Sequence, residues 1–160
     1  MGSVRQTAID TIVSNLSNIT TANNYTHDVG ADRVYRQADN PEMMPTPSII
    51  IVQGEENIER EYSDLYECAL EVIVGFVDNY NGTDPEGQAN LFLADIQKAI
   101  GREFTIVATP YGGSEAGVST VQLTEQSNTV TISSSLPGYI LGEIVFEMRY
   151  RRHMIDPNRV

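Results

Sequence analysis

The chain has 160 residues, a formal net charge of −12 at pH 7 and 41% hydrophobic residues. This length predicts one domain spanning residues 1–160, with enough apolar side chains for a core of its own. The single cysteine excludes an intramolecular disulfide, and no apolar run reaches the roughly 18 residues of a membrane span. The N-terminus lacks the layout of a signal peptide, so we expect a soluble protein of the cytosol, with no membrane partner.

The charge is distributed unevenly. Residues 39–86 contain 12 acidic residues and one basic residue, a net charge of −11, whereas residues 149–160 contain four arginines and one aspartate. A solvated acidic surface is one interpretation. A second is a self-assembling subunit whose acidic and basic regions meet across copies, or whose acidic face lines a channel that repels DNA phosphates. The chain has no clear basic stripe and no nucleic-acid-binding motif.

Two helices are predicted. Ser3 caps a first helix that runs to about Ile19, with apolar residues recurring on one face. Asp84 and Pro85 open a second helix that runs to about Ile100, and Gly101 follows as its stop. Both helices are amphipathic, which predicts that each packs against a sheet.

Strands are predicted by alternation and by β-branched runs. Residues 48–52 form an apolar run typical of a strand buried on both faces, which Gly54 is expected to end. Residues 65–77 and 139–151 alternate over long stretches, and residues 104–108 form a short strand. Residues 118–123 and 129–133 alternate as well, and residues 125–128 are expected to join them as a hairpin turn.

Other segments are expected to be irregular or short. The proline-rich residues 40–47 predict an exposed connector, and residues 34–35 a short strand, paired with Tyr25 in one interpretation. The loops at residues 20–32 and 109–117 are expected to be mobile in the free chain and to order on assembly. Together these elements predict an α+β fold, a largely antiparallel mixed sheet with two amphipathic helices packed against it.

The sequence lacks a catalytic constellation. Cys68 lies in an apolar alternation typical of a buried thiol, and neither His27 nor His153 has a predicted partner for acid–base work. The glutamates at positions 55, 56, 59 and 61 follow a strand and are typical of a wet loop. The glycine-rich residues 109–117 lack the ending of a phosphate-binding loop. We therefore expect no enzyme, no cofactor and no metal.

One family resemblance covers most of the chain. It rests on the opening helix, on Pro45-Thr-Pro-Ser-Ile-Ile-Ile51, on the helix Leu91-Phe-Leu-Ala-Asp-Ile-Gln-Lys-Ala-Ile100, and on Phe146-Glu-Met-Arg-Tyr-Arg-Arg152 before Asp156-Pro157. This layout resembles the tail terminator proteins of long-tailed phages of the siphophage type.

The resemblance implies a six-membered ring that caps the tail tube, stops its polymerisation and offers a surface for head attachment. Its implied partners are copies of itself, the tail tube protein and the head connector or neck protein, with genome DNA only passing through the lumen. The implied location is the virion tail at the neck junction, and the host cytoplasm during assembly. Two alternatives remain: a neck or tail-completion protein that joins the connector to the tail, and a small acidic binding module outside any virion.

A ring requires contacts between two different patches of each copy. The candidate interface residues come from the basic end and from the acidic region. They are Arg149, Arg151, Arg152, Glu55, Glu56 and Glu59. Arginine suits this role because its planar guanidinium binds a carboxylate through two hydrogen bonds. The other interpretation is that the arginines lie on a solvent-exposed face without a partner.

Overall fold

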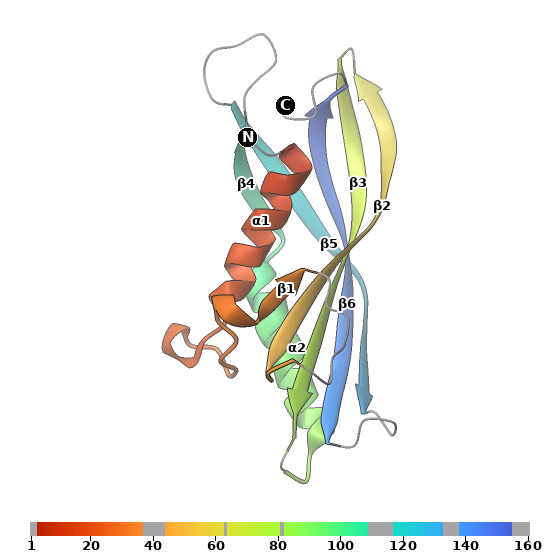
Figure 1. The fold of residues 1–160 in the computed structure, drawn as a ribbon. Coiled ribbons are helices and arrows are strands. Elements are labelled where there is room, and N and C mark those ends of the chain that lie inside the picture. The colour runs from red at the N-terminus through yellow and green to blue at the C-terminus, as the bar shows by residue number, and fades with distance from the viewer. Residues whose placement is uncertain are drawn as a thin grey trace.

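The computed structural model describes residues 3–36, 44–62, 64–80, 82–108, 117–132 and 138–154. Its elements in chain order are α1 (Val4–Ser17), 3-10 turns at Thr21–Asn23 and Ala31–Arg33, β1 (Val34–Arg36), β2 (Ser48–Tyr62), β3 (Leu65–Asn79), α2 (Pro85–Ile100), β4 (Glu103–Ala108), β5 (Gly117–Ile132) and β6 (Tyr139–His153). The strands form one sheet in the order β1-β2-β3-β6-β5-β4 (Figure 1). Only the β1–β2 pair is parallel, so the predicted mixed, largely antiparallel sheet with two helices is confirmed.

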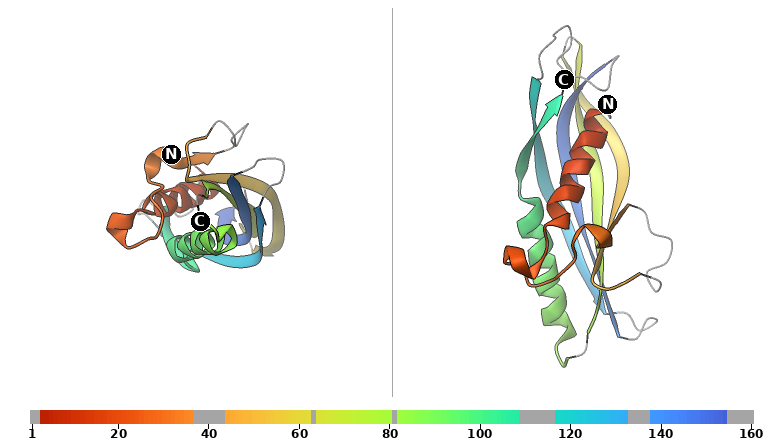
Figure 2. Two further views of the ribbon diagram at one scale, coloured as in Figure 1. Left: turned by 90° about the horizontal axis from the view of Figure 1, so that it is seen from below. Right: turned by 60° about the vertical axis from the view of Figure 1, so that its left-hand side comes forward.

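The sheet twists along its length and curls around the two helices, which lie on its inner face (Figure 2). Alternate residues of β3 point to the two faces, as expected from the period of a strand. Cys68, Leu70, Val72, Val74 and Phe76 are buried among the helices, whereas Glu71 on the opposite face is exposed. We call the side that faces the helices the inner face and the opposite side the outer face. In the described part of the chain, neither helix covers the outer face.

Both helices form where their capping residues predict. The side chain of Ser3 accepts a hydrogen bond from the Gln6 backbone N–H at 3.1 Å, and α1 ends at Ser17, two residues before the predicted end. In α2 the Asp84 side chain accepts from the Gly87 N–H at 2.9 Å, and Gly101 ends the helix with a φ of 68°. That positive φ requires a residue such as glycine.

The last strand is central in the sheet. β6 pairs along its whole length with β3, from Leu65 opposite His153 to Asn79 opposite Tyr139, and on its other side with β5. Its inner side chains, Ile144, Phe146 and Met148, are buried in the core. The Asp-Pro pair that closes the resemblance to the terminator family lies outside the described residues.

Four strand predictions are corrected. β2 does not end at Gly54 but continues to Tyr62, because β3 supplies partners as far as Leu65 and the register shift between Gln53 and Glu56 accommodates the extra residues. Its first part is not buried on both faces, since Val52 is 36% exposed.

The predicted hairpin at residues 125–128 is also wrong. β5 passes through this stretch as one strand, because β6 pairs with it on both sides of a register shift between Glu125 and Ser127. β1 pairs with β2 in parallel, Tyr35 opposite Ile50, and not with Tyr25. The predicted loop at residues 109–117 lies almost entirely outside the described residues, as do residues 40–43 of the predicted connector.

Candidate functional site

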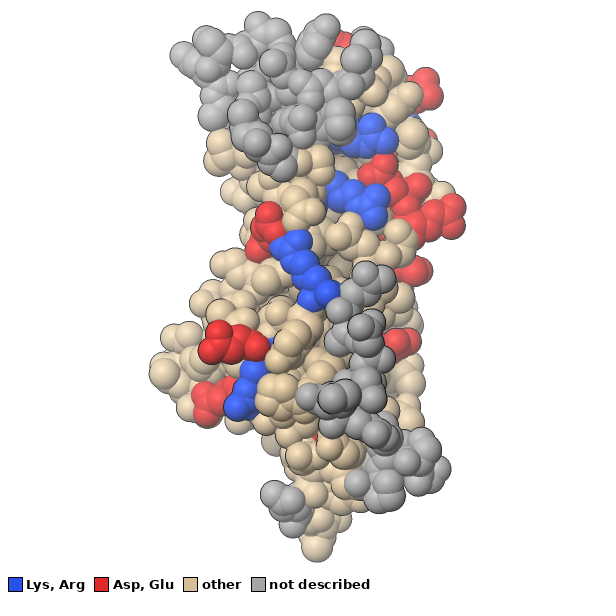
Figure 3. All heavy atoms as spheres, viewed as in Figure 1, with Lys and Arg blue, Asp and Glu red and all other residues tan. Residues whose placement is uncertain are grey.

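All six predicted interface residues lie where β2, β3 and β6 run side by side. β3 separates the other two strands and pairs with both, which brings the acidic stretch of β2 within side-chain reach of the basic end of β6. Figure 3 shows basic and acidic side chains next to one another over this part of the surface rather than in separate fields. The six residues divide between the two faces of the sheet.

On the inner face, Arg152 and Glu56 form a half-buried ion pair. The Arg152 Nη2 and Nε atoms donate to Glu56 Oε1 at 2.9 and 3.3 Å, and the Tyr150 hydroxyl donates to the other oxygen of the same carboxylate. The guanidinium also lies over the Tyr66 ring, 5.1 Å from its centroid. With side chains only 19% and 16% exposed, Arg152 and Glu56 are largely withdrawn from any partner.

The pKa values in this group follow from its burial and its hydrogen bonds. Burial alone would raise the pKa of Glu56, but the Tyr150 hydroxyl and the Arg152 guanidinium lower it. Burial, followed by the Glu56 carboxylate, raises the pKa of Tyr150 far above its usual value. The predicted buried thiol is confirmed, since Cys68 is fully buried, and this burial raises its pKa. The cluster thus links β2 to β6 across the intervening β3.

On the outer face, Arg149 holds two glutamates. Its Nη1 lies 3.1 Å from a Glu59 carboxylate oxygen and its Nε 2.6 Å from one of Glu147. The Arg151 guanidinium lies over the Tyr62 ring, 5.6 Å from its centroid. The Arg149 side chain is 42% exposed, and exposed ion pairs of this kind contribute little to stability because water and salt screen them. These arginines are therefore available to a partner at small cost.

Opposite charges thus meet within one chain, at Arg149–Glu59 and Arg152–Glu56. In one of the two interpretations of the charge distribution, the acidic and basic regions meet across copies. Some of these charges instead pair within one chain, because only β3 lies between β2 and β6 in the sheet. A role of these residues between copies stays a prediction.

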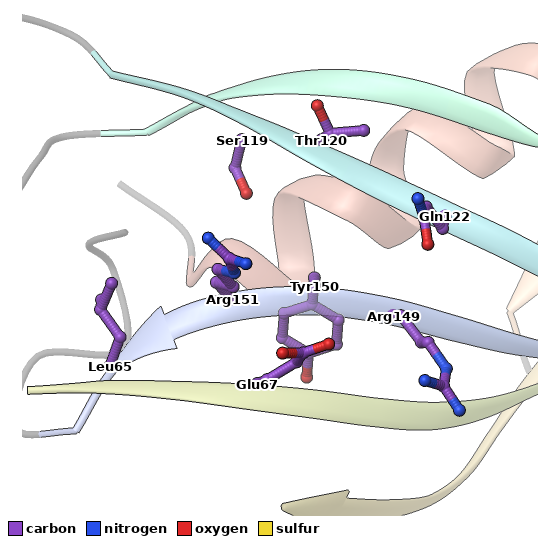
Figure 4. Close-up of a pocket in the computed structure, with 8 residues that line it drawn as sticks. All are labelled: Leu65, Glu67, Ser119, Thr120, Gln122, Arg149, Tyr150 and Arg151. Carbon is purple, nitrogen blue, oxygen red and sulfur yellow. The ribbon is translucent and has the colours of Figure 1, made fainter. Parts of the chain in front are cut away.

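A polar hollow of about 560 Å³ lies beside the two exposed arginines. The β5–β6 ladder stops at Gln122 and Arg149, and beyond this point the two strands diverge. Figure 4 shows Arg149, Tyr150 and Arg151 in sequence along β6, with Arg151 on the side of the gap and the Arg149 and Tyr150 side chains extending toward β3. The rest of the lining consists of Leu65, Glu67, Ser119, Thr120 and Gln122. Hydroxyl, amide and guanidinium groups of this kind can bind polar side chains or backbone, but the lining contains no histidine and no cysteine.

An acidic hollow of about 570 Å³ adjoins it on the outer face. Glu71 and Glu147 are direct partners across the β3–β6 ladder, and Glu55 and Glu59 line the same hollow. Like charges directly opposite each other in a sheet are destabilising. Of these four acids, only Glu59 and Glu147 have an arginine partner at hand. The remaining negative charge favours a basic partner on this face.

A second polar cluster, which the sequence analysis missed, surrounds His27. Its Nδ1 lies 2.8 Å from Asp95 Oδ2, its Nε2 lies 3.4 Å from Asp78 Oδ2, and its ring packs against Phe92 with centroids 4.3 Å apart. Asp95 also accepts from the backbone N–H groups of Thr26 and His27 at 3.0 Å each. One signal was present in the sequence: Asp95 lies on the apolar stripe of α2, three residues after Phe92.

This cluster fixes a loop that we expected to be mobile. Besides the contacts to Asp95, the Asp28 carboxylate accepts from the Thr21 N–H at 2.6 Å, and Lys98 Nζ donates to the Asn24 carbonyl at 2.9 Å. Residues 21–28 are therefore attached to α2 and to the end of β3 in the single chain. The prediction that this loop orders only on assembly is not supported by these contacts.

The cluster predicts a pH dependence of stability. Burial alone would lower the pKa of His27, but hydrogen bonds to Asp78 and Asp95 raise it above 6.5. The folded state therefore retains the proton longer than the unfolded state, and the stabilisation is complete below about pH 6.5 and is lost as the pH rises through the raised pKa. We expect urea unfolding to show this fall in the wild type and a flatter profile in His27→Gln. If the free energy of unfolding depends on pH equally in the wild type and in His27→Gln, His27 is not the group responsible.

The described residues give no sign of a metal centre or a membrane span. No three or more His, Cys, Asp or Glu side chains within the described ranges are grouped so that they could hold a metal ion. In the same ranges, no helix has both the length and the apolar composition needed to cross a bilayer.

The structure itself defines the class of fold, an α+β domain with a curled six-stranded sheet. No protein-family model matches the sequence, and no curated protein matches it. A chain in a solved structure described as "Virion of native gene transfer agent (GTA) particle" aligns with 10% sequence identity and a TM-score of 0.48, covering 94% of this chain and 96% of that chain.

Proposed function

We propose that this chain is a virion assembly protein, the tail terminator of a long-tailed phage. In this role a ring of copies caps the finished tail tube, stops its polymerisation and presents the surface for head attachment. The sequence features that resemble the terminator family support the proposal. The expected sheet with its two packed helices and the central last strand are consistent with it.

The observation that carries the proposal is the character of the outer face. No helix of the described ranges covers it, and it bears the acidic hollow beside the exposed arginines Arg149 and Arg151. A heterologous contact requires two different patches on each copy. The acidic hollow and the adjoining arginines supply one such patch, in which charges of both signs lie side by side. Complementary charge sets specificity and register, while apolar contacts supply affinity.

We propose further that the chain acts without catalysis. The hollow beside the arginines has no histidine or cysteine among its lining residues. His27 is enclosed by two carboxylates and a phenylalanine ring, and His153 is 1% exposed. A turnover reaction measured with the purified chain would contradict this.

Electron microscopy tests the proposed role directly. The purified chain mixed with tail tubes is expected to form a ring at one tube end and to block further addition of tube protein. A phage that lacks the chain is expected to make tails of uncontrolled length. Tails of normal length in its absence would refute the terminator role, and labelling at the neck without an effect on length would favour the neck or tail-completion alternative.

Charge reversal at Arg149 and Arg151 tests the interface. We expect Arg149→Glu combined with Arg151→Glu to leave the fold intact, because exposed ion pairs contribute little to stability. Binding to tubes should weaken by roughly tenfold or more, because like charges then meet at the contact. Sedimentation with tubes measures the binding, and circular dichroism checks the fold.

Arg102→Glu is the control for added negative charge, because Arg102 is an exposed arginine on the connection between α2 and β4. It is expected to bind tubes like the wild type. Unfolding of the double variant would show that Arg149 and Arg151 serve the domain itself, and equal loss of binding in Arg102→Glu would show a non-specific charge effect.

A further inference from the structure

The sheet has two unequal free edges. On one side β1 covers β2 only at Ile49–Ile51, so among the described residues no strand pairs with residues 52–62 on the side of β2 that faces away from β3. On the other side β4 pairs with β5 only as far as Gln122, and Leu123 donates to the Arg102 carbonyl, so among the described residues no strand pairs with residues 124–132 on the side of β5 that faces away from β6. A free strand edge presents unpaired N–H and C=O groups and is a template for another strand.

The free edge of β2 carries the features that prevent strand addition. It holds four glutamates within residues 55–61 and two register shifts, at Gln53/Glu56 and Ile58/Arg60. Charged side chains and bulges on an edge both discourage pairing with a further strand. This edge is protected.

The free edge of β5 carries none of these features in residues 127–132. The segment Ser-Asn-Thr-Val-Thr-Ile has no charge, no proline and no register shift beyond Ser127, and Ile132 is 44% exposed. Among the described residues, no backbone hydrogen bond is made by the N–H and C=O groups of this segment that point away from β6. An uncharged edge of this composition is typical of a strand that pairs with another chain.

A matching edge lies at the same level on the opposite side of the sheet. The row can be followed from strand to strand across the sheet. Tyr35 of β1 is opposite Ile50 of β2, which is opposite Gly75 of β3. Gly75 is opposite Glu143 of β6, which is opposite Thr129 of β5. Tyr35 and Thr129 therefore occupy one row and, because paired residues share a face, both point to the outer face. Among the described residues, no backbone hydrogen bond is made by the N–H and C=O groups of β1 that point away from β2.

The strand directions favour the same pairing. β1 runs parallel to β2, and three antiparallel steps separate β2 from β5, so β1 and β5 run in opposite directions. A copy generated by rotation about an axis along the strands keeps these directions, so its β1 lies antiparallel to β5 of the first copy. The other two edges, β4 and the free part of β2, would meet in parallel and with the glutamates of β2 in the contact.

We propose that residues 127–132 of β5 pair in antiparallel fashion with β1 of a second copy, head to tail. Because the two edges lie in one row, repeated addition needs no shift along the strands and can close into a ring. This contact deepens the proposed function, on which it rests, by naming the strands that join neighbouring copies.

Disulfide trapping tests the pairing on the full chain. Cys68, the only cysteine, is first replaced by alanine. Tyr35→Cys is then combined in turn with Ser127→Cys, Thr129→Cys and Thr131→Cys, which lie on one face and cover three registers, since a disulfide needs Cα atoms within about 7 Å. Each protein is oxidised alone at high concentration and with tail tubes, and is run on a non-reducing gel.

We expect a ladder of covalent oligomers from at least one double variant and none from the corresponding single variants. No ladder from any of the three would overturn the pairing. A dimer from Thr129→Cys alone would also overturn it, because it would show two copies of β5 meeting across a two-fold axis. Rings on tubes without a ladder would leave the terminator function standing, whereas a ladder without tube binding would remove that function and keep the strand contact.

A charge on the edge provides a second test without cysteines. Thr129→Lys is expected to abolish self-association measured by sedimentation, because an edge lysine opposes strand addition. Thr105→Lys is the matched control, since Thr105 is exposed on β4, whose edge the proposed contact does not use. Self-association of Thr129→Lys at the level of the control would contradict the proposal.

Discussion

Replacing Asp95 by asparagine is expected to lower the free energy of unfolding by about 3 kcal/mol, the scale measured when one partner of a buried ion pair is removed. The Asp95 side chain is 8% exposed and lies 2.8 Å from the His27 ring nitrogen. It also accepts the backbone N–H groups of Thr26 and His27. An amide loses the charge and presents two hydrogens toward groups that already donate. Chemical denaturation measures the loss.

Asp28→Asn is the matched control, because Asp28 belongs to the same loop but is exposed. It accepts from Thr21 at 2.6 Å, and its replacement should cost no more than about 1 kcal/mol, as for a surface capping residue. Hydrogen exchange gives a local measurement: the amides of Thr26 and His27 should lose protection in Asp95→Asn. If those amides stay protected, Asp95 does not hold the loop.

Replacing Gly142 by alanine is expected to destabilise the fold by about 2 kcal/mol, within the usual range for overpacking a core. A Cβ at this position would overlap the ring of Phe76, which is opposite Gly142 in the β3–β6 ladder. The ring cannot move away easily, because it is 1% exposed and stacks on Phe92 with centroids 4.7 Å apart. The midpoint of urea unfolding measures the effect.

Gly75→Ala is the control, since its Cβ would meet only backbone oxygens of Gly142 and Ile50, at 3.7 and 3.9 Å. These are ordinary contacts, and we expect a change within about 1 kcal/mol. Phe76→Leu should reduce the cost of Gly142→Ala, because a smaller side chain removes the overlap. Strict additivity of Phe76→Leu and Gly142→Ala in a double-mutant cycle would contradict the assigned contact.

The sequence could predict those elements whose formation depends on residues close together in the chain. Both helices begin at their predicted caps, Ser3 and Asp84, because a cap acts on backbone groups two or three residues away. The long strands β3 and β6 were predicted because each alternates strongly enough to define its own inner face. The α+β class follows from these elements.

Partners distant in the sequence decided the rest. β2 passes Gly54 and β5 passes residues 125–128 because β3 and β6 supply hydrogen-bond partners on both sides of each irregularity. Local residue preference at these positions favours a turn, but the ladder outweighs it.

The candidate site shows the same division. Composition located the acidic stretch and the basic end, and so named Glu56 and Arg152, but it did not place them in one ion pair within a single chain. That pairing follows from β3 lying between β2 and β6. Likewise, His27 and Asp95 are 68 residues apart and meet only when the loop packs on α2. Capping and periodicity act within a turn or a strand and can be read from the chain, whereas strand order and buried charge pairs depend on which distant segments the folded chain brings together.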